Sequence, residues 1–262
     1  MTLEHWIEYP LEPRELLLAW EAPLSVEDRA RWVVGRLSKD GGDITFDYLA
    51  GEAFAALNLG RPHSALEAAG FPGYPAFEGK EHPQGTFRGQ VLKTFLRRLP
   101  SPRRPDFARY LAHHHVKPST VLSPLALLAV TGARLPGDDF SLVDPLDPEQ
   151  CRADLVFEVA GVRHHGQHAG MVRMEDLLTL EPEPSNPRDP RAVQVKTGGE
   201  VIGYVNRLQA ETIGEWLKQR MVTCRVIRLN GSADARRIYA FLQVRPRRSI
   251  AAQNHEMENT QV

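Results

Sequence analysis

The chain has little cysteine and no long apolar stretch, and both absences limit what it can be. Its 262 residues include two cysteines, Cys151 and Cys224, which lie far apart. This spacing excludes a disulfide framework and a zinc site made of cysteines alone, and it is typical of a reducing cytosol. The first residues (MTLEHWIEYPLEPRE) hold acids and prolines where a secretory signal would hold basic and apolar residues. No stretch reaches the roughly 18 apolar residues of a membrane helix, so we expect a cytoplasmic protein without a membrane partner.

The common motifs of catalysis and cofactor binding are also missing. The sequence contains neither a P-loop nor the G-x-S-x-G turn of serine hydrolases. The histidines His113, His114 and His115 are consecutive, so on a helix their side chains point about 100° apart and do not converge on one metal ion. The acids are scattered over loops rather than clustered. We therefore expect no metal, no cofactor and no catalytic residue, and an enzyme such as a nuclease or phosphohydrolase is the third-ranked alternative.

Charge is distributed unevenly along a chain whose net charge is −1. Residues 151–262 carry 16 lysines and arginines against 13 acids, and the stretch from Arg220 to Arg248 holds eight arginines and one acid. A basic region of this kind indicates an acidic partner such as nucleic acid. A solvated surface with uneven charge is the competing interpretation.

The first half of the chain mixes strand and helix patterns. Strands are predicted at 14–20 and on both sides of a tight turn at 39–42, whose residues tolerate positive φ. Apolar residues at three- and four-residue steps, together with capping residues, mark the helices. These helices are predicted at 52–59, at 91–99, from Asp106, and from Ser123 to Gly132. The pattern predicts an α+β domain over residues 14–145.

A segment rich in proline and acids, residues 136–150 (PGDDFSLVDPLDPEQ), is predicted to be the linker to a second domain. After it the pattern changes to about five short strands and one amphipathic helix, at 208–220. This content favours a small β-barrel or OB-like sheet over residues 150–248. The tail, residues 249–262, is polar and aperiodic, so we expect it to be disordered.

The second domain resembles the HIRAN family. The resemblance rests on the segment NPRDPRAV, which begins at Asn186, on the Gly-Tyr pair that begins at Gly203, and on GVRHH upstream, residues 161–165. The family pattern is Asn-Pro-aromatic-Asp-x-x-Ala-Ile, then a Gly-aromatic strand and a helix. Arg188 and His164 depart from it, because each stands where the family often has an aromatic residue.

This resemblance implies an OB-like barrel that grips the 3′ end of a single DNA strand, as in domains of the family fused to helicases. In that arrangement arginines pair with phosphates, a carboxylate accepts a hydrogen bond from the terminal hydroxyl, and a tyrosine stacks on a base. The implied nucleic-acid contacts are Arg163, His164, Arg188, Asp189, Tyr204 and Arg207, and the implied motif residues are Asn186, Pro187, Ala192 and Gly203. Two alternatives stay open: the Asn-Pro and Asp-Pro pairs only build a turn, and Tyr204 only belongs to the core.

The first half of the chain resembles the N-terminal subdomain of HipA-type kinases. The matching pieces are FLRRLP at 95–100 and LALLAVTG at 125–132. The kinase core itself is missing, because the sequence has no Gly-rich phosphate loop before a lysine strand, no His-Arg-Asp loop and no Asp-Phe-Gly. The resemblance therefore implies a scaffold for protein interaction and no kinase activity.

Together these features favour a bacterial accessory protein of DNA repair or processing that binds single-stranded DNA or DNA ends. A helicase, a nuclease or a HipA-type kinase is an expected protein partner. The alternative is a HipA-related, antitoxin-like regulator without catalytic activity, in which the C-terminal domain is a passenger.

Overall fold

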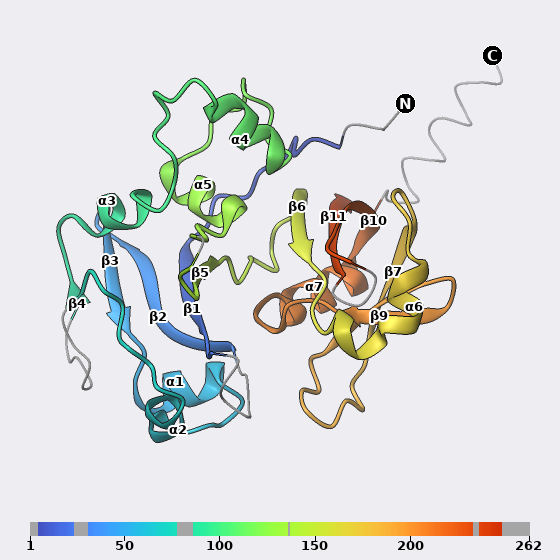
Figure 1. Cartoon of the computed structure of the whole chain (residues 1–262), viewed down its shortest axis with the longest axis horizontal. Coiled ribbons are helices and arrows are strands. Elements are labelled where there is room, and N and C mark those ends of the chain that lie inside the picture. The colour runs from blue at the N-terminus through green and yellow to red at the C-terminus, as the bar shows by residue number, and fades with distance from the viewer. Residues whose placement is uncertain (1–4, 24–30, 78–85, 136, 233–235, 248–262) are drawn as a thin grey trace, which may run out of the picture. The chain divides into compact units, whose positions relative to one another are not determined.

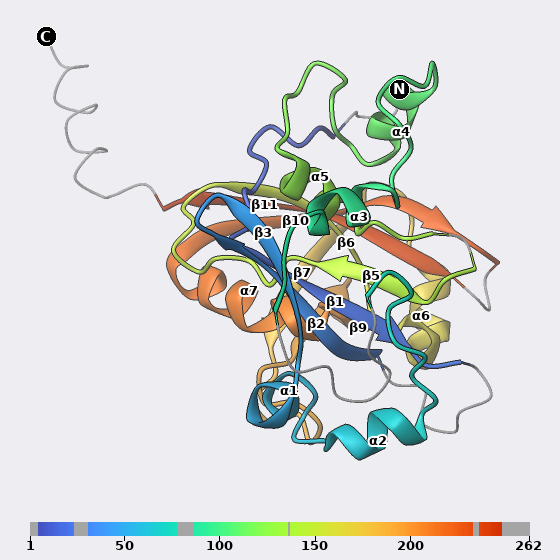
Figure 2. The same ribbon diagram turned by 90° about the vertical axis from the view of Figure 1, so that its left-hand side faces the viewer.

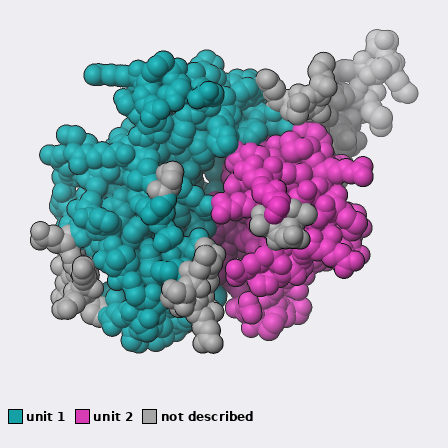
Figure 3. All heavy atoms as spheres, viewed as in Figure 1, with its two compact units in different colours: residues 1–147 teal, residues 148–262 magenta. Residues whose placement is uncertain are grey.

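A computed structural model describes residues 5–23, 31–77, 86–135, 137–232 and 236–247 of the chain (Figure 1). The tail that was expected to be disordered, 249–262, lies outside these residues. The chain divides into two compact units, residues 1–147 and 148–262 (Figure 3).

The first unit is built on a five-stranded antiparallel sheet of order β4-β3-β2-β1-β5. Its strands are β1 (Glu15–Glu21), β2 (Arg31–Asp40), β3 (Asp43–Tyr48), β4 (Thr86–Phe87) and β5 (Phe140–Val143). Gly41 and Gly42, both with positive φ, form the turn between β2 and β3, so the predicted hairpin is confirmed. Phe46 of β3 is fully buried and packs against Phe95 and Phe77, with ring centroids 5.8 and 4.7 Å away.

Five short helices join these strands. They are α1 (Gly51–Leu57), α2 (His63–Ala68), α3 (Val91–Leu96), α4 (Phe107–His113) and α5 (Pro124–Thr131). The predicted ends of α5 are confirmed: the hydroxyl of Ser123 accepts a hydrogen bond from the Ala126 amide, and Gly132 ends the helix with φ of 65°. Asp106 does precede α4, but its side chain makes no capping bond and pairs with Arg104 instead.

The predicted linker is wrong for its central residues. Phe140–Val143 form strand β5, all four residues are buried, and they pair with β1. The sequence did not indicate this strand (FSLV), because acids and prolines flank it and a run of four residues is too short to show a strand periodicity. The first unit therefore extends through residues that composition assigned to a linker.

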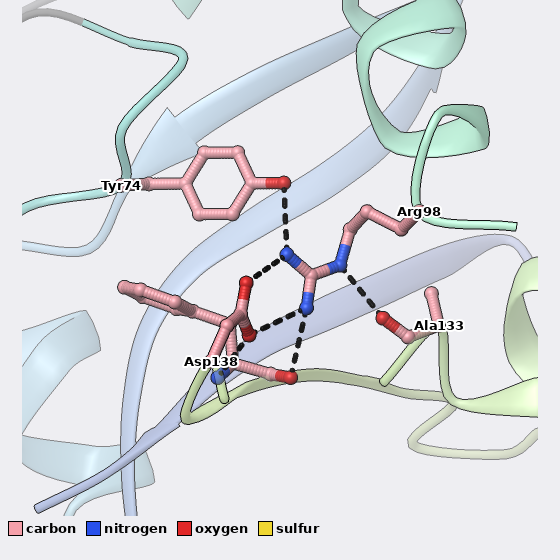
Figure 4. Close-up of polar contacts among 5 residues, drawn as sticks. Tyr74, Arg98, Ala133 and Asp138 are labelled. Carbon is pink, nitrogen blue, oxygen red and sulfur yellow. Dashed lines mark hydrogen bonds and ion pairs between the residues drawn. The ribbon is translucent and has the colours of Figure 1, made fainter. Parts of the chain in front are cut away.

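A buried arginine fastens β5 to the helical side of the first unit (Figure 4). The side chain of Arg98 is 5% exposed and forms a two-bond ion pair with Asp138, at 2.6 and 2.7 Å. Its Nε donates to the carbonyl of Ala133 at 2.7 Å, and a terminal nitrogen donates to the carbonyl of Phe140 at 3.0 Å. The guanidinium thus donates hydrogen bonds to one carboxylate and two backbone carbonyls, which would otherwise lack these partners.

The second unit holds a six-stranded antiparallel sheet of order β6-β11-β10-β7-β8-β9. Its strands are β6 (Ala153–Glu158), β7 (Leu177–Pro182), β8 (Val193–Thr197), β9 (Glu200–Tyr204), β10 (Arg220–Asn230) and β11 (Arg237–Pro246). The predicted β-barrel is corrected to an open sheet, in which β6 and β9 are the edge strands. A single antiparallel bridge, between Ala160 and Tyr204, joins the chain after β6 to β9.

One long helix and one short one accompany this sheet. The predicted helix is confirmed as α7 (Arg207–Gln219), which contacts β7, β8 and β10 (Figure 2). Its apolar face buries Ile213 and Trp216, and the side chain of Asn206 caps its first turn. The 3₁₀ turn η1 (Val162–His165) and helix α6 (Gly166–Met171) were not predicted. The sequence did not predict them, because this segment contains two glycines and shows no apolar periodicity.

Candidate nucleic-acid interface

The site is centred on Tyr204, the last residue of β9, which is half-buried rather than enclosed in the core. The chain leaves β6, turns at Gly161 with φ of 72°, and runs as η1 against β9. A Cβ at Gly161 would make an ordinary van der Waals contact with the Tyr204 ring, at 3.8 Å, so it is the positive φ that favours glycine here. The ring of His165 lies 5.9 Å from that of Tyr204, at an angle of 54°. We call these residues, with Arg163, His164 and Glu183, the Tyr204 site.

Basic side chains from η1 and α6 border the Tyr204 site. Arg163 and His164 are exposed, and the guanidinium Nε of Arg163 donates to Nε2 of His164 at 3.2 Å. Burial, followed by repulsion from His164 and His168, lowers the pKa of His165. His168 lies 3.5 Å from the carboxylate of Glu200. An approaching phosphate would favour the charged form of His165.

The loop after β7 carries the NPRD motif and is folded by its own side chains. Oδ1 of Asn186 accepts hydrogen bonds from the amides of Arg188 and Asp189, at 3.0 and 3.2 Å. Asp189 is only 7% exposed, and its Oδ1 accepts from the amide and the Nε of Arg191, at 3.0 and 3.3 Å. These bonds show that Asn186 and Asp189 build the turn, and the contact of this loop with nucleic acid stays a prediction. Arg188, at the outer part of the loop, is exposed and accessible to a ligand.

A carboxylate connects this loop to Tyr204. Nδ2 of Asn186 donates to Oε2 of Glu183 at 2.6 Å, and the hydroxyl of Tyr204 also hydrogen-bonds to the Glu183 side chain. The amide of Glu183 donates to the carbonyl of Ala192 at 2.8 Å, which closes the base of the loop. Pro187 is exposed within the loop. The motif therefore sets the position of Arg188 relative to Tyr204.

Gly203 is required by close packing beside the site. It has φ of +153°, and a Cβ there would lie 2.6 Å from Val159 Cγ1 and even closer to the carbonyl oxygen of Ala160. Real Cβ contacts essentially never fall under 3.0 Å. The absence of a side chain lets Ala160 and Tyr204 exchange two backbone hydrogen bonds, both of 2.8 Å. Glycine at this position thus holds the chain entering η1 against β9.

The structure brings most of the implied contact residues to this region through packing, hydrogen bonds or closeness in sequence to Tyr204. Arg163 and His164 lie on η1, which packs on β9, and Arg188 and Asp189 lie on the loop tied to Tyr204 through Asn186 and Glu183. Arg207 is the first residue of α7, three positions after Tyr204, and is half-buried.

Two residues of the site were not selected from the sequence. His165 was visible as the second member of a histidine pair, but nothing local places its ring beside Tyr204. Glu183 stood in a Glu-Pro-Glu-Pro run that predicts only a turn.

The arginine-rich stretch after residue 220 is largely used to hold the fold. Arg228 stacks over the ring of Tyr239 at 4.0 Å, and Arg245 pairs with the buried carboxylate of Asp154 at 2.7 Å. Arg236 donates to the carbonyls of residues 169, 170 and 172, at the end of α6. Arg247 donates to the carbonyl of Leu217 in the last turn of α7. The charge surplus that suggested an acidic partner therefore does not itself define a binding surface.

The described ranges hold neither a candidate metal site nor a helix that could span a membrane. Within them no group of three or more histidine, cysteine, aspartate or glutamate residues is arranged to hold a metal ion. No helix there is long and apolar enough to cross a membrane. Cys224 lies in the core of the second unit, and burial raises its pKa to about 12, so this thiol is not a nucleophile at neutral pH.

Residues 153–245 match the family model of the HIRAN domain. This segment is a HIRAN domain. It includes strands β6 to β10, all of β11 except its last residue, and the whole Tyr204 site.

Two solved structures are similar to this part of the chain. The crystal structure of the HIRAN domain of human HLTF is 21% identical, with a TM-score of 0.30, and the match covers 35% of this chain and 74% of that one. The crystal structure of a protein from Lactobacillus plantarum is 20% identical, with a TM-score of 0.31, and the match covers 36% and 96% of the two chains. No curated protein matches this chain. The resemblance of residues 14–145 to HipA-type kinases stays a prediction.

Proposed function

We propose that the HIRAN domain of this chain binds single-stranded DNA at its 3′ end and acts as an accessory module in DNA repair or processing. HIRAN domains are known for binding DNA, and the family match supports that part of the proposal. The observation that carries it further is the half-buried Tyr204 ring, with His165 beside it and exposed Arg163 on the adjoining turn. An aromatic face bordered by cations is the arrangement that single-strand binders use.

Each residue has a distinct role in this proposal. Tyr204 stacks on a base, which contributes about 1–3 kcal/mol. Arg163 and Arg188 pair with phosphates through their forked guanidinium groups, with His164 and Arg207 adding contacts to the strand. Asp189 orders the loop that presents Arg188. The proposed partners are a DNA strand end and, through the rest of the chain, a helicase, a nuclease or a HipA-type kinase.

Fluorescence anisotropy with labelled oligonucleotides tests the proposal. The purified full chain is titrated against a single strand with a free 3′-hydroxyl, the same strand with a 3′-phosphate, and a blunt duplex, at two salt concentrations. We expect the hydroxyl-ended strand to bind most tightly. Affinity should fall with salt, with a slope of about 0.7 for each phosphate contact.

Variants assign the binding to the site. Tyr204→Ala should weaken binding about 5- to 150-fold, which corresponds to the loss of one stacked base. Arg163→Ala and Arg188→Glu should weaken it and reduce the salt slope, whereas Arg103→Ala, which removes an exposed arginine of the first unit, should leave it unchanged. Absence of binding to every oligonucleotide would overturn the proposal and favour the protein-interaction alternative. Equal, salt-sensitive binding to all three would leave only a basic surface.

A further inference from the structure

Glu183 is the one acidic side chain that reaches the Tyr204 ring through a hydrogen bond among the described residues of the site. It follows β7 and is half-buried, with its carboxylate held by the side chains of Asn186, Tyr204 and Gln194. The hydrogen bond from Asn186 is the main cause that lowers its pKa. The group is therefore a fixed anion at neutral pH, and it is bonded directly to the ring that Arg163 and His165 border.

The hydrogen bond also fixes what the end of the tyrosine presents. Burial and then the bond to Glu183 raise the pKa of Tyr204, so the phenol stays protonated. Its O–H donates to the Glu183 carboxylate, which leaves the phenol oxygen as an acceptor. A group placed next to the end of this ring meets acceptors and a negative charge. A neutral donor such as a hydroxyl or an amino group satisfies that environment, and a phosphate does not.

The other carboxylate of the loop is less suited to this role. Asp189 is 7% exposed, and one of its oxygens already accepts two hydrogen bonds from Arg191. Its second oxygen has little access to solvent. Glu183 is the more open of the two acids, and it is the one bonded to the stacking ring.

We infer that Glu183 sets the specificity of the site for the terminal group of the strand. A nucleotide stacked on Tyr204 offers a neutral hydrogen-bond donor to Glu183, and a terminal phosphate at the same place is repelled. The arginines bind the phosphates further along the strand, so attraction and repulsion are separated within one site. This inference rests on the proposed binding of a strand end.

The test compares ends rather than overall affinity. Wild-type protein, Glu183→Gln and Glu183→Asp are titrated with one single strand that ends in a 3′-hydroxyl, a 3′-phosphate or a 3′-deoxy sugar. We expect wild type to favour the hydroxyl over the phosphate by tenfold or more, a size set by one charge-assisted hydrogen bond. Glu183→Gln should bring that ratio close to one, mainly because the phosphate-ended strand binds more tightly. Glu183→Asp, which keeps the charge, should retain most of the preference.

Two further comparisons identify the group that donates the hydrogen bond to Glu183 and control for the loss of a surface carboxylate. Strands that end in thymidine or in cytidine distinguish a base amino group from the sugar hydroxyl, because cytosine carries an exocyclic amino group there and thymine does not. Glu215→Gln, on α7 and paired with Lys218 at 2.7 Å, is the matched control and should keep the wild-type ratio.

The failures can be told apart. If wild type binds strands and Glu183→Gln keeps the full preference for hydroxyl, the role of Glu183 is refuted and the proposed function stands. If wild type binds no strand, the proposed function fails and the role of Glu183 fails with it. If Glu183→Gln does not fold, as judged by thermal unfolding, Glu183→Ala takes its place, and a folded Glu183→Ala that keeps the full preference for hydroxyl overturns the inference.

Discussion

Replacing Gly203 by alanine should lower the free energy of unfolding of the HIRAN domain by far more than the addition of one methyl group usually does. The new Cβ would overlap the carbonyl oxygen of Ala160 and lie 2.6 Å from Val159 Cγ1, on a backbone with φ of +153°. Backbone strain at such a φ costs about 1–3 kcal/mol. Overpacking in a close contact costs about 1–3 kcal/mol more. We therefore expect a loss of about 2–6 kcal/mol, a large part of the roughly 5–15 kcal/mol that stabilises a typical domain.

Native-state hydrogen exchange with mass spectrometry measures this loss within one unit of the full chain. The amides of Ala160 and Tyr204, which exchange hydrogen bonds across the bridge, should lose protection first. Strand binding should weaken in the same variant, because η1 and Tyr204 are no longer held together.

A second glycine supplies the control. Gly214 lies inside α7, and a Cβ there would meet only Val193 Cγ2, at 4.0 Å. Gly214→Ala should therefore stabilise the domain by about 0.5–1 kcal/mol. A Gly203→Ala protein that stays within about 0.5 kcal/mol of wild type would refute the packing argument.

Three further predictions concern charge in the two units. Burial, and then the nearby acids, raise the pKa of Asp144 to about 6. Protonated Asp144 therefore stabilises the first unit fully below the pKa of the unfolded state, and this stabilisation is lost as pH rises through 6. Asp144→Asn should remove that dependence and stabilise the first unit by about 2–3 kcal/mol at pH 7.5 in urea unfolding. Arg98→Ala leaves a carboxylate and two carbonyls without their arginine partner and should cost about 3–5 kcal/mol. Arg104→Ala breaks an exposed ion pair and should cost far less, because solvent screens that pair. Equal losses of the two variants in urea unfolding would contradict the buried network. Strand affinity should rise as pH falls from 8 to 5.5 at constant ionic strength, because bound phosphate stabilises protonated His165, whose pKa burial lowers in the free protein. His165→Gln should flatten that profile in anisotropy titrations.

Much of the fold follows from local patterns. The turn at Gly41–Gly42, the caps of α5 and the amphipathic pattern of α7 could be predicted, because each depends on residues close in sequence. Strand β5 and helix α6 were not readable, because they are short and gain their stability from partners far along the chain. The open sheet also escaped prediction, since closure depends on how two edge strands meet and not on their composition.

The candidate site divides in the same way. The NPRD motif and the Gly-Tyr pair are local and led to Tyr204, Asp189 and Gly203. The contact of Tyr204 with Glu183 and His165 depends on strand register, including the irregularity in the pairing of β8 with β9 at Val195. A shift of one residue in that pairing would turn Tyr204 to the other face of the sheet.

Photocrosslinking tests the central claim most directly. A single strand that carries 4-thiothymidine at its 3′ end is irradiated with the full chain, and the attached peptides are identified by mass spectrometry. The account predicts crosslinks within residues 161–168, 183–192 or 204–207 that are lost when unlabelled hydroxyl-ended strand competes. Crosslinks confined to residues 5–147, or crosslinks that no strand end displaces, would contradict it.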